Sequence, residues 1–216
     1  MKTLALIAHH ATSLVNFRGP LIREIVARGH RVVALAPDFD AATRSELEPL
    51  GVETREYPLA RTGMHPWQDL KSLLALRTLL AEIKPDVSLS YSTKPVIYGT
   101  LAAAWAEVPH RVALIEGLGF AFTDDGKLPG AKRRGLQAVL SLLYGQALSR
   151  AHQVLMLNLD DVSEFTKRGL VAAGQVQCLG GIGVDLTAWQ PIPLPQLPEH
   201  LITFALAARL LREKGI

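Results

Sequence analysis

Short apolar runs alternate with longer segments of helical periodicity along almost the whole chain. The first run, Leu4–Ala8, is apolar at every position, which is typical of a strand buried on both faces of a parallel sheet. An apolar stripe at helical spacing follows. Proline is favoured at the first position of a helix, so Pro20 is expected near the start of this one. We therefore expect a helix that starts between Asn16 and Pro20. The next apolar run, Val32–Ala36, would complete a strand–helix–strand unit.

The same alternation continues to about residue 180. Further strands are expected at 52–57, 87–90, 111–115, 153–157 and 176–179, and further helices at 41–50, 66–83, 95–106, 129–147 and 160–168. Six or seven strands that alternate with helices predict an α/β fold with a doubly wound, mostly parallel, Rossmann-like sheet.

The pattern changes after residue 185. Four prolines, at positions 191, 193, 195 and 198, leave no room for regular structure and are typical of a linker between domains. An apolar run at Leu201–Leu206 then predicts a new strand. We expect residues 1–185 to form one domain, residues 186–200 a linker, and residues 201–216 only the first strand of a truncated second domain.

Composition narrows the classes of partner. The 216 residues are 49% hydrophobic and carry a net charge of +3, which permits anionic partners. Aromatic residues make up only 6% and are not interleaved with basic ones, so a nucleic-acid partner is not expected. The single cysteine, Cys178, fits a reducing, cytoplasmic compartment and is expected to be a small core side chain. No histidine pair has metal-ligand spacing, and we expect no metal site.

Three common site motifs are absent from the sequence. No G-x-G-x-x-G follows the first expected strand, and no Walker lysine motif is present, which argues against dehydrogenases and nucleoside triphosphatases. No serine stands in a G-x-S-x-G elbow, which argues against the common hydrolases.

Candidate site residues follow the expected strands, because ligands of an open parallel sheet bind beyond the carboxyl ends of its strands. They are Ser13, Asn16 and Arg18 after the first strand, Lys94 after the fourth, Glu116, Gly117 and Gly119 after the fifth, and Asn158 after the sixth.

The charged candidates suggest specific chemistry. Glu116 is placed to act as an acid, a base or an acceptor for a sugar hydroxyl, and a loop-bracing glutamate is an equally supported alternative. Arg18 and Lys94 lie near expected helix starts, where a cation opposes the helix dipole, and this favours binding of an anion. Asn158 is more typical of a helix N-cap than of a ligand.

Two further cations bracket the turn that would follow the run at Leu201–Leu206. Arg209 and Lys214 suit a diphosphate, the arginine as a bidentate donor and the lysine as a point charge. A solvated basic turn is the alternative.

Taken together, several segments resemble a known family. They are Asn-Phe-Arg-Gly-Pro-Leu-Ile (16–22), Arg-Gly-His-Arg-Val (28–32), Thr-Lys-Pro-Val-Ile-Tyr-Gly (93–99), Glu-Gly-Leu-Gly-Phe-Ala-Phe-Thr (116–123), Asn-Leu-Asp-Asp (158–161), Gly-Val-Asp-Leu (183–186) and Ala-Arg-Leu-Leu-Arg-Glu-Lys-Gly-Ile (208–216). The chain resembles the N-terminal half of a family 4 retaining glycosyltransferase with the GT-B fold. It is especially similar to the branch that adds sugars to polyprenyl-diphosphate-linked saccharides.

The resemblance implies two Rossmann-like domains that face each other across a cleft. The N-terminal domain would bind a lipid-linked sugar acceptor, and the C-terminal domain a nucleotide-sugar donor, with a UDP-sugar expected. The resemblance assigns the donor diphosphate to Arg209 and Lys214, with Ala208 in place of a leading glycine, and puts the loop around Ser13 to Arg18 beside it. Glu116 replaces the family's usual histidine and is the catalytic candidate. No cofactor or metal is expected, because cationic side chains stabilise the leaving diphosphate.

Membrane contact is a further expectation. Lys132, Arg133 and Arg134 open an otherwise apolar expected helix, which suits the surface of an anionic membrane on its cytoplasmic face. A core helix with a solvated basic start is the favoured alternative.

Two other functions remain open from the sequence. One is a GT-B-fold sugar-nucleotide 2-epimerase, and the other is a non-catalytic half-protein. Because a cleft needs two walls, the 216-residue chain alone is expected to be inactive in sugar transfer.

Overall fold

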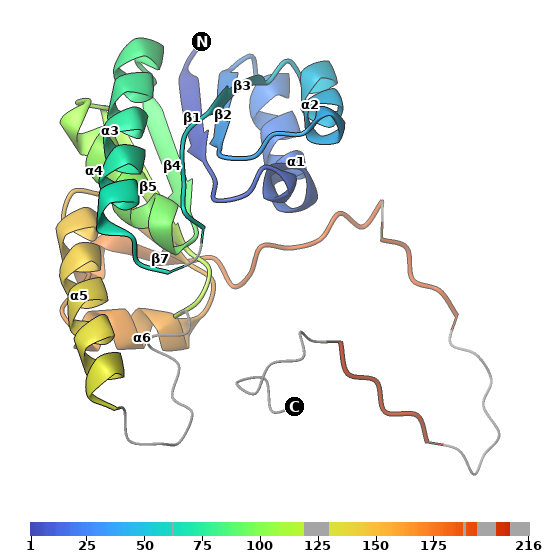
Figure 1. Cartoon of the computed structure of the whole chain (residues 1–216). Helices are drawn as coiled ribbons and strands as arrows, with labels where there is room; N and C mark the ends of the chain where they lie inside the picture. The colour runs from blue at the N-terminus through green and yellow to red at the C-terminus, as the bar shows by residue number, and fades with distance from the viewer. Residues whose placement is uncertain (62, 119–129, 188, 194–201, 208–216) are drawn as a thin grey trace.

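The computed structural model of the chain describes residues 1–61, 63–118, 130–187, 189–193 and 202–207. In this part of the chain, seven parallel strands form one sheet with the order β3-β2-β1-β4-β5-β6-β7 (Figure 1). The strands are β1 (Thr3–Ile7), β2 (Arg31–Ala36), β3 (Glu53–Glu56), β4 (Val87–Tyr91), β5 (His110–Ile115), β6 (Gln153–Met156) and β7 (Val176–Cys178). The sheet grows outward in both directions from β1 and β4, so the predicted doubly wound, Rossmann-like α/β fold is confirmed.

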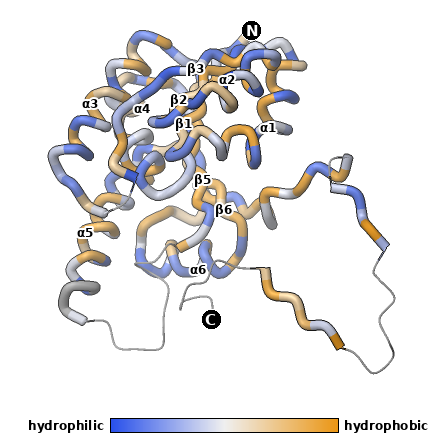
Figure 2. The backbone as a smooth tube through the Cα atoms, turned by 45° about the vertical axis from the view of Figure 1, so that its right-hand side comes forward, coloured by the Kyte–Doolittle hydropathy of each residue, from blue (hydrophilic) through white to orange (hydrophobic). Residues whose placement is uncertain are grey.

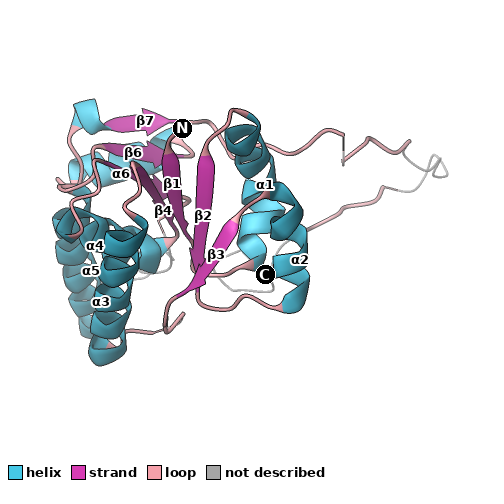
Figure 3. Ribbon diagram, turned by 90° about the horizontal axis from the view of Figure 1, so that it is seen from above, coloured by secondary structure: helices cyan, strands magenta, loops and turns pink. Residues whose placement is uncertain are grey.

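Helices cover both faces of this sheet (Figure 3). One face carries α1 (Thr12–Ala27) and α2 (Ala41–Leu47), which ends in the short 3-10 helix η1 (Glu48–Leu50). The other face carries α3 (Pro66–Ile83), α4 (Thr100–Trp105), α5 (Ala131–Leu148) and α6 (Leu159–Lys167). A π-helical turn, η2 (Pro95–Gly99), leads into α4, and a second 3-10 helix, η3 (Ala173–Gln175), precedes β7.

The core lies on both sides of the central strands. Alternate residues of β1 point to opposite faces: Leu4 and Leu6 pack in the cluster under α1, whereas Ala5 and Ile7 pack in the cluster under α3 and α4. A strand buried on both faces needs apolar side chains at every position, which accounts for the uninterrupted run in the sequence. Figure 2 shows the resulting hydrophobic colour along the central strands.

Helix α1 begins earlier than predicted. It starts at Thr12 and contains Pro20, which therefore does not mark its first turn. Proline costs a helix one backbone hydrogen bond, but α1 is held against the sheet by its own buried residues, such as Leu14 and Ile22. Arg18 consequently lies in the second turn of α1. The expectation that it lies near the helix start and opposes the helix dipole there was wrong.

The strand predicted at Leu201–Leu206 is not formed over residues 202–206, and Leu201 lies outside the described residues. Residues 202–207 are described and have no regular structure (Figure 1). The side chains of Ile202, Phe204 and Leu206 are exposed. A strand is stabilised by hydrogen bonds to a neighbouring strand, and the described residues provide none for this segment. The described residues within 186–193 also contain no helix or strand. The division into two domains and a linker stays a prediction.

Cys178 is exposed, so its expected place in the core was wrong. It ends β7, a short strand at the edge of the sheet, where side chains are covered on fewer sides than in the central strands.

Candidate functional site

The loops after β1 and β4 meet at one point of the sheet edge. These two strands are neighbours, and their connections run in opposite directions, which in open α/β sheets creates a crevice for ligands. Ser13, in the first turn of α1, lies there. Its hydroxyl is 2.8 Å from the hydroxyl of the buried Tyr91, the last residue of β4. The sequence rule for strand ends therefore placed Ser13 correctly.

The structure brings two predicted site residues together at this edge. The guanidinium of Arg18 donates a hydrogen bond to Oε1 of Glu116, which directly follows β5, and forms an ion pair with it. Ser92 Oγ donates to the other carboxylate oxygen of Glu116 at 3.0 Å. Arg18 also stacks over the ring of Tyr91, with 4.5 Å between the guanidinium carbon and the ring centroid. Both oxygens of Glu116 are thus oriented by the protein.

The burial of the two charged groups is unequal. The side chain of Arg18 is 4% exposed, whereas that of Glu116 is 30% exposed. A buried cation needs a partner of opposite charge, and Glu116 provides it while one side of the carboxylate stays open to solvent. A carboxylate held in this way accepts hydrogen bonds. The carboxylate of Glu116 is therefore suited to accept a hydrogen bond from a hydroxyl group. It also makes the loop-bracing contact that was the alternative role expected from the sequence.

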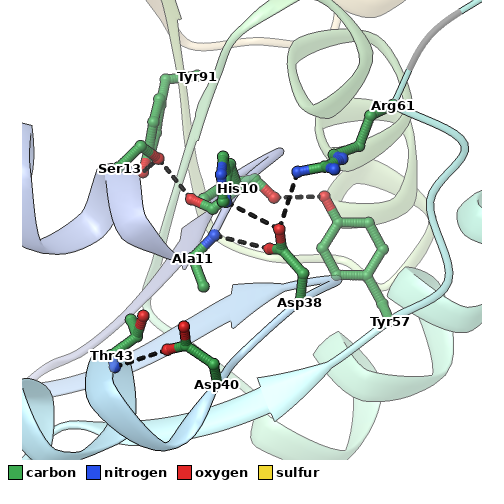
Figure 4. Close-up of polar contacts among 10 residues, drawn as sticks. His10, Ala11, Ser13, Asp38, Asp40, Thr43, Tyr57, Arg61 and Tyr91 are labelled. Carbon is green, nitrogen blue, oxygen red and sulfur yellow. Dashed lines mark hydrogen bonds and ion pairs between the residues drawn. The ribbon is translucent and has the colours of Figure 1, made fainter.

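Asp38, which the sequence reasoning missed, organises the loop between β1 and α1 (Figure 4). Its Oδ1 accepts a hydrogen bond from the backbone N–H of Ala11 at 2.8 Å. Its Oδ2 lies 2.8 Å from Nδ1 of His10 and 3.0 Å from a guanidinium nitrogen of Arg61. Asp38 comes two residues after the end of β2, so the strand-end rule applied to β2 would have found it.

The same loop has a second support. The hydroxyl of the buried Tyr57 donates to the carbonyl oxygen of Ala8 at 2.6 Å (Figure 4). Burial raises the pKa of Tyr57 above its ordinary value, so the phenol stays a hydrogen-bond donor. Burial, followed by the neighbouring charge of His10, lowers the pKa of His9 and favours its neutral imidazole.

Lys94 already has a partner in the protein. Its ammonium donates to Oδ1 of Asp69 at 2.7 Å, and the two side chains are 14% and 5% exposed. The other oxygen of Asp69 accepts from the backbone N–H of His65 at the start of α3. Lys94 is therefore a paired, largely buried cation.

The remaining predicted residues have different positions. Asn158 is the N-cap of α6: its side-chain oxygen accepts from the backbone N–H of Asp161 at 2.8 Å, as expected for a capping residue. Asn16 is exposed on α1, and Gly117 follows Glu116. Gly119, Arg209 and Lys214 lie outside the described residues, and their assignments stay predictions.

Within the described ranges, no group of three or more His, Cys, Asp or Glu residues is arranged to hold a metal ion. None of the helices described there combines the length and the apolar character needed to cross a bilayer.

The chain is 29% identical over 189 residues to N,N'-diacetylbacillosaminyl-diphospho-undecaprenol alpha-1,3-N-acetylgalactosaminyltransferase of Campylobacter jejuni, an alignment that covers 88% of this chain and 48% of the relative. The chain thus spans about half the length of the curated relative that it matches.

Solved structures share the fold. HepE of Anabaena, crystallised with UDP and glucose, has a TM-score of 0.57 and 12% identity over 89% of this chain and 47% of its own. A UDP-N-acetylglucosamine 2-epimerase has a TM-score of 0.54 and 14% identity over 82% of this chain and 45% of its own. Residues 17–180 match the sequence model of the glycosyl transferase 4-like domain. Because this match covers most of the sheet and the candidate site, the chain belongs to the glycosyl transferase 4-like family, and its resemblance to family 4 GT-B glycosyltransferases is confirmed.

Proposed function

We propose that this chain is the acceptor-side part of a glycosyltransferase that moves a sugar from a nucleotide-sugar donor to a lipid-linked saccharide. The observation that carries the proposal is the oriented carboxylate of Glu116, held by Arg18 and Ser92 at the carboxyl edge of a family 4 domain. The Campylobacter relative is named as a transferase of N-acetylgalactosamine onto a diphospho-undecaprenol-linked sugar, which supports this acceptor class. HepE was crystallised with UDP, which supports a UDP-sugar as the donor.

In the proposed reaction, the bond between the anomeric carbon of the donor sugar and the diphosphate breaks. A bond between that carbon and an acceptor hydroxyl oxygen forms on the same face, so the configuration is retained. The hydroxyl proton passes to the leaving diphosphate. Glu116 accepts a hydrogen bond from the acceptor and orients it. Arg209 and Lys214 are proposed to neutralise the diphosphate, so that neither a metal nor another cofactor is needed.

The test uses the longer protein that includes a second domain. UDP-sugars are supplied one at a time, with and without a prenyl-diphosphate-linked saccharide, and transferred sugar is measured by mass spectrometry. Glu116→Gln is expected to lower kcat about 100-fold, because one accepting oxygen becomes an NH2 group and the acceptor hydroxyl is no longer held in its reactive orientation. Glu24→Gln is the matched control, since Glu24 is an exposed carboxylate on α1 that pairs with Arg28.

The epimerase is the second candidate, because a UDP-N-acetylglucosamine 2-epimerase shares the fold. The two functions differ in their need for an acceptor. Acceptor-dependent transfer supports the proposal. Conversion of the donor sugar without any acceptor would overturn it in favour of the epimerase.

Peripheral contact with the cytoplasmic face of a membrane is part of the proposal. Arg134 is exposed on α5, and Val139 and Leu142 of the same helix are 42% and 64% exposed. Basic and apolar residues together favour an anionic bilayer. Flotation with vesicles that contain anionic lipid should fall when residues 132–134 are all replaced by glutamate, and unchanged flotation would end this part of the proposal.

A further inference from the structure

A cavity of about 580 Å³ adjoins the candidate site on the α3 and α5 side of the sheet. The two regions are joined by consecutive residues. Ser92 contacts Glu116, and the next two residues, Thr93 and Lys94, line the cavity. Glu116 itself is followed two positions later by Leu118, which lines the cavity as well. The volume is in the range of sites that hold small organic ligands, about 300–1,000 Å³.

One wall of the cavity is apolar. Leu136, Leu140 and Leu143 of α5 recur at a spacing of four and three residues, which places them on one face of the helix. Ile97 of η2 and Leu118 extend this wall. A saccharide or a free nucleotide offers such a wall less continuous apolar surface than a hydrocarbon chain does. The wall therefore favours a ligand with a hydrocarbon part.

The polar lining combines the two cations with other polar groups, namely Asp69, Thr93, Tyr98 and Tyr144, and both cations have N–H donors to spare. Lys94 uses one of the three N–H groups of its ammonium for Asp69, and no other acceptor for it occurs among the described residues. Arg61, which also lines the cavity, donates through one guanidinium nitrogen to Asp38 and has no other hydrogen bond within the described ranges. Both cations can therefore bind anionic oxygens without giving up their carboxylate partners.

Apolar surface continues from the cavity to the outside. Met64 is part of the lining and is 42% exposed. Trp67 and Leu70, in the first turns of α3, are 79% and 42% exposed. A hydrocarbon chain that enters the cavity next to Met64 would have apolar surface beside it on the protein.

We propose that this cavity binds the first isoprene units of a polyprenyl diphosphate, with the diphosphate at Lys94 and Arg61 and the hydrocarbon against the leucines of α5. The proposal rests on the proposed function, since a lipid-linked acceptor would carry both parts. It places the diphosphate of the acceptor beside Glu116, so that the attached saccharide extends along the carboxyl edge of the sheet.

The test measures binding to the full 216-residue chain by calorimetry, with farnesyl diphosphate, inorganic diphosphate and dodecyl phosphate as probes. Farnesyl diphosphate should bind at least about tenfold more tightly than either of the others. Equal affinity for inorganic diphosphate would show that the hydrocarbon is not bound. Equal affinity for dodecyl phosphate would show that isoprene is not recognised. Either result overturns the proposal.

Variants on α5 locate the site. Leu140→Trp fills the cavity and should weaken binding of farnesyl diphosphate about tenfold while inorganic diphosphate binds as before. Leu142→Trp is the matched control, because Leu142 is 64% exposed and does not line the cavity. Equal effects of both variants would contradict the proposal.

A second measurement does not depend on variants that must fold. A benzophenone analogue of farnesyl diphosphate should label the peptide from Arg134 to Tyr144 in the unaltered chain, and labelling elsewhere would overturn the proposal. The proposed function and the proposed cavity ligand can be contradicted independently. Binding without sugar transfer in the longer protein would contradict only the transferase, and transfer without binding here would contradict only the cavity.

Discussion

Arg18 and Glu116 are 98 positions apart in the chain and form a hydrogen-bonded ion pair in the fold. The arginine comes from the second turn of α1 and the glutamate from the end of β5, so the pair connects two segments across β1 and β4. Because only the arginine is fully buried, removal of one partner is not equivalent to removal of the other.

We expect Glu116→Ala to destabilise the fold more than Arg18→Met. Loss of the glutamate leaves a buried cation without its counter-charge, at a cost of about 3 kcal/mol. Loss of the arginine leaves a carboxylate that water can reach, at a cost of about 1 kcal/mol. Urea unfolding measures both values. Arg23→Met is the control, because Arg23 is 51% exposed in its pair with Asp185, and exposed pairs contribute about 0–1 kcal/mol. Equal costs for the two main variants would contradict the assigned burial.

The pair of Lys94 and Asp69 should behave as a buried unit. Asp69→Leu leaves the ammonium of Lys94 uncompensated and should cost about 3–5 kcal/mol, whereas Asp69→Leu combined with Lys94→Met should recover much of that loss. Thermal unfolding of the single and double variants measures the difference. Lys2→Met gives the contrast, since Lys2 is 69% exposed and its pair with Asp86 has a similar length of 2.8 Å. A double variant no more stable than the single one would be inconsistent with this view.

Gly99 should not tolerate a side chain. A Cβ atom at this position would lie 2.7 Å from Oγ of Ser90 and 3.2 Å from the side chain of Ile7. Because these atoms belong to central strands, Gly99→Ala should destabilise the fold by about 1–3 kcal/mol through overpacking. Gly135→Ala in α5 is the matched control: its Cβ meets no atom of the described residues within 4 Å, so the higher helix propensity of alanine should leave stability unchanged or improve it. Equal effects in calorimetry would refute the close approach.

Stability should decrease as the pH falls from about 7.5 to 5, in part through His9. Burial and the charge of His10 lower the pKa of His9 in the folded state, although Glu116 and Asp38 act in the opposite direction. The unfolded chain, in which the imidazole has its ordinary pKa of 6.5, then binds more protons than the folded chain. The contribution of His9 to stability is therefore present above pH 6.5. It is lost as the pH falls toward the lower pKa that His9 has in the folded state, with a slope of at most about 1.4 kcal/mol per pH unit.

The variant His9→Gln should reduce this slope without abolishing it, because burial also lowers the pKa of His152. The measurement is urea unfolding at several pH values, with each protein referred to its own stability at pH 8, where the imidazole is neutral in both states. A slope identical to that of the unaltered chain would contradict the role of His9.

Local patterns in the sequence were sufficient for the strands of the described sheet and most helices, but not for residues 202–206, where the predicted strand is not formed. Leu4–Ala8 and Val32–Ala36 are apolar at every position because both faces of their strands are covered, and this requirement is visible in a few neighbouring residues. Asn158 was likewise predicted as a cap, because asparagine is preferred at the N-cap position of a helix. The start of α1 was not, because Pro20 is tolerated inside the helix only through packing of the residues around it.

The site depended more on tertiary structure. The strand-end rule selected Ser13, Arg18, Lys94 and Glu116 one by one, since it needs only the ends of strands. It did not indicate that Arg18 pairs with Glu116 or that Lys94 pairs with Asp69, because each pair joins side chains from different elements. The sequence by itself determined the succession of strands and helices along the chain and selected several of the side chains at the carboxyl edge, because hydrophobic periodicity is a local property. Only the tertiary structure decided the partners of these charges, because electrostatic pairing and burial depend on distances in space rather than along the chain.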